Sequence, residues 1–160
     1  MQSIHIICPG KLKESYLCDA VAEYSKRLSP YCKLTVTELP AQRLPENPSR
    51  AQIEASLKKE AESIIASIPE LAFVCALCIE GKQLSSEQFA KALSAKSVSG
   101  ISSFAFIIGS SHGLDASVKE RADFLLSLSE MTFPHQLTRV ILLEQIYRSY
   151  QIDKGGKYHK

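Results

Sequence analysis

The sequence has 160 residues, 45% of them hydrophobic, which is enough to bury one core but not two comfortable ones. Its net charge of +2 is too small to indicate a nucleic-acid partner by itself. No apolar stretch approaches the roughly 20 residues that span a bilayer, and residues 1–5 lack the plan of a secretory signal. We therefore expect one domain over residues 1–160 in a soluble, cytoplasmic protein with no membrane contact.

The first half of the chain alternates strands and helices. A short apolar strand over residues 3–8 precedes a helix over residues 14–29, whose apolar positions recur at helical spacing. A second strand covers residues 33–38, where apolar residues alternate with threonines, and a proline-containing loop follows. The next helix, residues 49–67, carries one apolar stripe, and Glu60 is among the charged residues that lie off it.

The second half continues the same alternation. Strands are predicted over residues 73–79 and 104–108, and the helix between them opens at the capping-box pair Ser85 and Gln88. Both strands are continuously apolar, which is typical of strands that are buried on two faces. The pattern predicts an α/β fold with a mostly parallel sheet and helices on both faces.

The cysteines argue for a reducing compartment, because five of them cannot all pair within one chain. The Cys75-x-x-Cys78 spacing is also found at redox and zinc sites. Here it falls inside the predicted strand 73–79, where side chains three positions apart point to opposite faces. We expect these thiols to pack in the core, and we expect no metal.

Gly109 and Gly113 enclose a short loop directly after the strand 104–108, and two of the four histidines, His112 and His135, lie in or after it. Open α/β sheets bind ligands at the carboxyl ends of their strands, so we expect the functional site in this late part of the chain. No P-loop or G-x-G-x-x-G turn occurs. A flavodoxin-like nucleotide binder would instead place its ligand loop early.

The last predicted helix, residues 136–150, carries more apolar surface than one buried stripe needs. That surplus fits a helix-mediated interface or a helix buried inside a monomer. From Arg139 to the end, five basic residues stand against two acidic ones, so positive charge gathers at this end. Two interpretations explain that charge equally well. One is a solvated helix face followed by a basic tail, and the other is a surface that contacts phosphates.

Several motifs together resemble the ribosomal RNA large subunit methyltransferase H family, which belongs to the SPOUT class of knotted methyltransferases. The resemblance covers essentially the whole chain. The motifs that carry it are Gly10-Lys11-Leu12-Lys13, Tyr24-Ser25-Lys26-Arg27-Leu28, Ile107-Ile108-Gly109-Ser110-Ser111-His112-Gly113-Leu114, the stretch from Leu126 to Val140, Leu143-Glu144-Gln145-Ile146-Tyr147-Arg148 and the terminal Tyr158-His159-Lys160.

The resemblance implies a five-stranded, mainly parallel α/β sheet whose C-terminal segment forms a trefoil knot. It implies a homodimer that transfers a methyl group from S-adenosyl-L-methionine to N3 of a pseudouridine in 23S rRNA, in the hairpin facing the decoding centre. Assembled ribosomes are the implied substrate. A ribosome-associated binding module that keeps this fold without catalysis is the alternative.

The resemblance also implies a cofactor site. Apolar side chains would wall it, and backbone groups of a bent loop would hydrogen-bond the adenine edge. The residues implied are Leu77, Gly109, Leu128, Ser129, Glu130, Met131, Thr132 and Phe133. The family usually has a second glycine where this chain has Ser110, and we expect binding to survive if Ser110 keeps a negative φ.

The implied catalytic residues are His159, Arg148 and Tyr158. His159 suits proton removal by residue type, Arg148 favours negative charge on the base carbonyls, and Tyr158 stacks or orients the base. Apart from the resemblance, a terminal Tyr-His-Lys is usually a frayed end, and Arg148 is spaced to pair with Glu144. For His135 and Arg139 we expect structural or interface roles.

Overall fold

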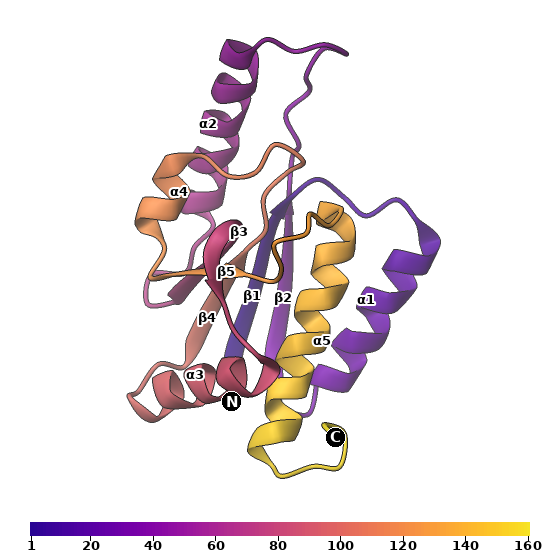
Figure 1. Cartoon of the computed structure of the whole chain (residues 1–160), viewed down its shortest axis with the longest axis vertical. Coiled ribbons are helices and arrows are strands. Elements are labelled where there is room, and N and C mark those ends of the chain that lie inside the picture. Colours follow the sequence, from indigo (N-terminus) through magenta and orange to yellow (C-terminus); the bar gives the residue numbers. More distant parts are fainter.

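The computed structural model describes all of residues 1–160 and contains one sheet of five strands, in the order β2-β1-β4-β3-β5 (Figure 1). Every pairing between neighbouring strands is parallel, as the alternating pattern predicts. The strands are β1 (Gln2–Pro9), β2 (Cys32–Leu39), β3 (Phe73–Gln83), β4 (Ser103–Ile107) and β5 (Phe124–Ser127).

Helices cover both faces of the sheet, so the sheet is the middle layer of three. One face carries α1 (Ser15–Leu28), α3 (Ser86–Val98) and α5 (His135–Asp153), and the other carries α2 (Arg50–Ala66) and α4 (Ala116–Arg121).

Side chains alternate between the two faces along each strand, because successive residues of a strand point in opposite directions. In β4, Phe104 and Phe106 pack on the α1, α3 and α5 side, whereas Ala105 and Ile107 pack on the α2 and α4 side. All four side chains are at most 1% exposed. The strand is therefore continuously apolar from Phe104 to Ile107, as a segment buried on two faces must be.

The predicted strands and helices are confirmed, including the capping box in which Ser85 and Gln88 bond each other's backbone N–H groups. Two elements escaped the residue pattern: α4 has 6 residues and β5 has 4, too few to show a period. Only the resemblance supplied the fifth strand. The trefoil knot stays a prediction, because strand order and pairing do not define threading.

The cysteine prediction is confirmed for Cys75, which is 4% exposed in the core, and all five cysteines are free thiols. Burial raises the pKa of Cys75 to about 12, so this thiol stays protonated. No helix is long and apolar enough to cross a membrane. No group of three His, Cys, Asp or Glu side chains is arranged to hold a metal ion.

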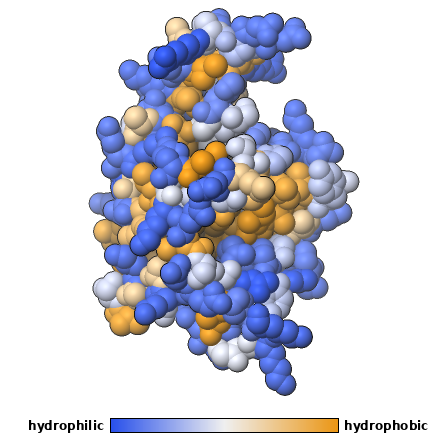
Figure 2. Space-filling view, in the orientation of Figure 1, coloured by the Kyte–Doolittle hydropathy of each residue, from blue (hydrophilic) through white to orange (hydrophobic).

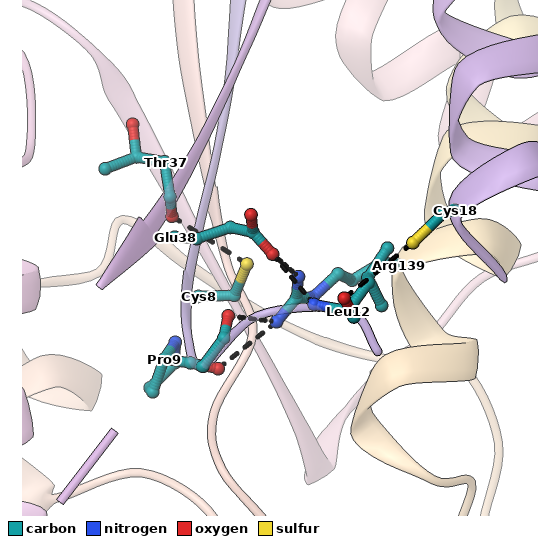
Figure 3. A network of polar contacts seen from close by, with 8 residues as sticks. Cys8, Pro9, Leu12, Cys18, Thr37, Glu38 and Arg139 are labelled. Atoms are coloured by element: carbon teal, nitrogen blue, oxygen red, sulfur yellow. Dashed lines mark hydrogen bonds and ion pairs between the residues drawn. The ribbon is translucent and has the colours of Figure 1, made fainter. Parts of the chain in front are cut away.

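Arg139 is the largest of the fully buried side chains, and Figure 3 shows it between α5 and the carboxyl ends of β1 and β2. Its Nη1 lies 2.7 Å from Glu38 Oε2, and its Nη2 donates to the carbonyls of Pro9 at 3.2 Å and Gly10 at 2.8 Å. Its Nε has no partner. The structural role expected for Arg139 is confirmed.

The idea of a basic phosphate-contacting surface at the C-terminal end is weakened by these contacts. Arg139 is 1% exposed and paired with Glu38, and Arg148 is paired with Glu144 at 2.7 Å. Lys154 lies with its Nζ 4.3 Å from the centre of the Tyr31 ring. The two arginines are therefore held in ion pairs within the fold, and Lys154 packs against an aromatic ring.

Replacing Arg139 with Met should destabilise the protein by about 3 kcal/mol, because a buried ion pair is broken and two carbonyls lose their donor. Urea unfolding at a fixed protein concentration measures this. Arg50→Ala is the matched control, since its pair with Glu54 is exposed and contributes at most about 0.5 kcal/mol. Equal effects of the two substitutions would contradict the role given to Arg139.

Candidate active site

A cavity of about 760 Å³ opens at the carboxyl edge of the sheet, where β3, β4 and β5 lie side by side. Its walls come from three segments, residues 77–80, 108–114 and 126–138. These segments are far apart in the sequence, but parallel pairing brings the ends of their strands to one edge. The volume lies within the range of about 300–1,000 Å³ that is usual for ligand sites.

One wall is a bulge in β3. Leu77 and Lys82 both pair with Leu126 of β5, so the residues between them, 78–81, loop out of the ladder. Gly81 makes this possible, because a Cβ at that position would lie 2.7 Å from the carbonyl carbon of Leu126. The bulge carries Cys78, Ile79 and Glu80 onto the cavity.

The loop 109–113 forms a second wall and is closed on itself. The N–H of Gly113 donates to the carbonyl of Ser110 at 2.9 Å, and Gly113 has a φ of +89°. A Cβ on Gly109 would lie 2.5 Å from the Gly113 oxygen, so only glycine fits there. Ser110 keeps a negative φ, which is the condition under which its side chain is tolerated.

The third wall is the bent loop that joins β5 to α5. The Ser127 hydroxyl donates to the Ser129 carbonyl at 3.0 Å, and the Ser129 hydroxyl accepts the N–H of Met131 at 3.0 Å. These bonds fix the backbone before Pro134 begins α5. All but one of the predicted cofactor residues line the cavity; the exception is Glu130.

Glu60 approaches the loop 109–113 from α2, off the apolar stripe of that helix. It is nevertheless buried, at 6% exposed. Burial raises its pKa, although a hydrogen bond with Ser110 and the nearby His112 act in the opposite direction. The polar face of a helix can thus be buried when a neighbouring loop supplies hydrogen-bond partners.

Two further charged or titratable groups border the cavity. Lys119 of α4 pairs with Glu80 of the β3 bulge and lowers the pKa of that carboxyl. His135 is half-buried at the first turn of α5, and burial lowers its pKa, with Arg139 acting in the same direction. His135 therefore stays neutral at neutral pH and does not add positive charge to the cavity.

The predicted catalytic residues form a separate cluster around the chain end. His159 lies between Arg148, whose Nη1 is 3.2 Å from its Nδ1, and Glu87, whose Oε1 is 2.7 Å from its Nε2. The Tyr158 hydroxyl donates to Glu144 at 2.8 Å, and the Arg148 guanidinium lies 4.7 Å from the centre of the Tyr158 ring. The terminal residues are therefore bonded to α3 and α5 rather than frayed, and Arg148 does pair with Glu144.

The cavity and this C-terminal cluster lie at opposite ends of α5. None of His159, Arg148 and Tyr158 lines the cavity, whereas His135 does. From His135 to Arg148 the helix rises by about 20 Å, at about 1.5 Å per residue. Figure 1 shows the chain end at the foot of α5, far from the helix start. One chain alone does not unite the two sets of residues.

Apolar surface gathers near the cavity end of α5, as Figure 2 shows in the orientation of Figure 1. Leu137 is 38% exposed, Met131 is 75% exposed, and Ile141 is partly exposed one turn along the helix from Leu137. Leu142, Leu143 and Ile146 are buried inside the chain. Intrachain packing thus uses part of the apolar surplus of α5 and leaves part at the surface.

Comparison with known proteins gives a consistent result along the whole chain. The family model described as "Predicted SPOUT methyltransferase" matches residues 2–159. A relative from Carboxydothermus hydrogenoformans, called Ribosomal RNA large subunit methyltransferase H, is 54% identical over 157 residues, 98% of this chain and 99% of its own. Relatives of the same name from Streptococcus suis and Bifidobacterium adolescentis are 50% and 54% identical, with the same coverage.

A solved structure described as a probable methylase family protein from Haemophilus influenzae Rd KW20 has a similar fold. Its TM-score is 0.54 at 11% identity, and the match covers 98% of this chain and 70% of that one. At this identity the likeness concerns the fold alone. Because the family model and the relatives span nearly every residue, the chain belongs to the SPOUT methyltransferase family.

Proposed function

We propose that this protein methylates N3 of a pseudouridine in the 23S rRNA of assembled ribosomes, with S-adenosyl-L-methionine as the methyl donor. The observation that carries the proposal is the cavity at the late loops, in a chain about half identical to relatives named Ribosomal RNA large subunit methyltransferase H. The pseudouridine position and the decoding-centre hairpin come from the family resemblance.

The cavity has the properties that such a cofactor requires. Leu77, Leu128 and Phe133 supply apolar walls, and the backbone of the loop 128–133 presents N–H and C=O groups to an adenine edge. Gly109 also lines the cavity, and its missing Cβ lets the loop 109–113 fold back tightly beside it. When bound, S-adenosyl-L-methionine supplies a methyl group on a positively charged sulfur.

A homodimer explains why the cavity and the C-terminal cluster are about 20 Å apart in one chain. In a two-fold symmetric interface the same surface patch of both subunits is used. If the two α5 helices pack against each other antiparallel in such an interface, the start of one helix lies beside the end of the other. The exposed Leu137 and Met131 give the cavity end an apolar surface for this contact. The partner's chain end would then complete the cavity.

The side chains of the C-terminal cluster suit the chemistry of the acceptor base. The N3 proton must leave before N3 becomes a good nucleophile, and His159 is the group of suitable type to take it. Arg148 supplies positive charge that favours the anionic base, and Tyr158 packs against Arg148 with its ring. The remaining task is to align donor and acceptor and exclude water.

Calorimetry with S-adenosyl-L-methionine should show binding to the wild-type protein and at least about tenfold weaker binding to Gly109→Ala, because a new Cβ would displace the loop 109–113. Ser102→Ala is the control, since Ser102 is exposed and lies outside the cavity. No binding to the wild type would instead favour the non-catalytic binding module.

Mass spectrometry of 23S rRNA from cells that lack this protein should show loss of the N3-methylated pseudouridine. The wild-type gene should restore it and His159→Ala should not, while the cofactor affinity of that variant stays unchanged. Lys157→Ala, an exposed change in the same tail, is the matched control. A methylated pseudouridine that persists without the protein would eliminate the proposed activity.

Mixing Gly109→Ala subunits with His159→Ala subunits tests the shared site. Each variant alone should be inactive, but half of randomly mixed dimers are heterodimers with one intact cavity facing one intact tail. Activity should therefore recover to about a quarter of the wild-type value. If refolded mixtures stay inactive, the cavity and the tail of the same chain act together.

A further inference from the structure

Both ring nitrogens of His159 are engaged, and their partners define the position of its proton. Nδ1 lies 3.2 Å from Nη1 of Arg148, and Nε2 lies 2.7 Å from Oε1 of Glu87. An arginine only donates hydrogen bonds, and an ionised carboxylate only accepts them. Nδ1 must therefore carry a lone pair and Nε2 must carry the hydrogen.

We infer that Glu87 is a positioning residue of the proposed reaction, which holds His159 in the neutral Nε2–H tautomer and leaves Nδ1 as the proton acceptor. The inference rests on the methyl transfer proposed above. Sequence reasoning missed Glu87, because a glutamate in the first turn of a helix is usual and carries no sign of a partner 72 positions later.

Glu87 is well placed for this role because it belongs to a fixed element. It lies in the first turn of α3, directly after the capping box that starts at Ser85. A hydrogen bond with His159 lowers the pKa of its carboxyl, and its own backbone N–H acts in the same direction. A short tail is thereby oriented by a helix that packs against α5.

Arg148 holds the position that the substrate would take. Its Nε and Nη2 both bond Glu144 Oε1, at 2.8 and 2.7 Å, so only Nη1 faces His159. A base entering here would present its N3–H to Nδ1 in place of that contact, with the guanidinium still beside the base.

The proton balance of this step is simple. The N3–H bond breaks, the electron pair stays on N3, and the proton forms a new bond to Nδ1. His159 then becomes an imidazolium whose Nε2–H still faces the Glu87 carboxylate, which stabilises the new positive charge. The other charged or titratable groups around the cluster are Arg148, Glu144 and Tyr158, together with Tyr24 and Arg27 of α1.

The first test reads the tautomer directly, by nitrogen-15 NMR of the imidazole groups in the full-length protein without RNA. The His159 signals are assigned by their loss in His159→Ala. The wild type should show protonation at Nε2, Glu87→Ala should lose that preference, and Glu87→Gln should keep it through its amide oxygen. An unchanged tautomer in Glu87→Ala would overturn the inference.

The second test measures methyl transfer to ribosomes under single-turnover conditions. Glu87→Ala should lower the maximal rate about tenfold or more, without changing the cofactor affinity. Glu87→Gln should recover part of the rate, because its amide oxygen can still accept a hydrogen bond from Nε2–H of His159.

The control for both tests is Glu54→Ala, which removes an exposed carboxylate from a surface ion pair on α2. It should change neither the tautomer nor the rate. A wild-type rate in Glu87→Ala would overturn the role of Glu87 and leave the proposed function intact. If the wild type transfers no methyl group, the proposed function is wrong. If the NMR tautomer of His159 is also the same with and without Glu87, the positioning role is wrong as well.

Discussion

The close backbone approach at the carboxyl edge of the sheet is the constraint on which the cavity depends. At Gly81 and Gly109, backbone atoms of another segment of the same chain lie within 2.5–2.7 Å of where a Cβ would be. Larger residues would push the β3 bulge away from β5 or open the loop 109–113. Two of the three walls of the cavity, the β3 bulge and the loop 109–113, thus exist because two positions have no side chain.

Helix α5 connects the two halves of the proposed site. Its start borders the cavity, Arg139 fixes it to the ends of β1 and β2, and Arg148 near its other end holds the terminal histidine. A rigid helix therefore sets the distance between donor pocket and tail. This geometry supports the proposed homodimer, since a partner's tail would bridge the separation of about 20 Å that one chain leaves between cavity and tail.

The cluster at the chain end shows how a short tail acquires a defined geometry. Few residues follow α5, and an isolated terminal segment would be mobile. Here Glu87, Glu144 and Arg148 come from two packed helices and bond the tail on several sides. The contacts of Glu87 and Arg148 hold the two ring nitrogens of His159, and the bond between Glu144 and Tyr158 fixes the neighbouring residue.

Residue patterns predicted most of the fold, because apolar periods of 2 and 3.6 residues reflect which faces are buried. They failed for α4 and β5, which are too short to show a period, and they did not show the burial of Glu60, which depends on the loop 109–113. The proposed site residues came from the resemblance, because spacing alone did not distinguish the tail from a frayed end.

The sequence by itself determined four of the five strands, four of the five helices, the capping box at Ser85 and the late position of the loops, since these depend on local backbone preferences and on burial of neighbouring side chains. Only the tertiary structure decided that residues 77–80, 108–114 and 126–138 share one cavity, that Arg139 is buried against Glu38, and that Glu87 faces His159. Those contacts join positions far apart in the chain, and a linear pattern contains no record of such distances.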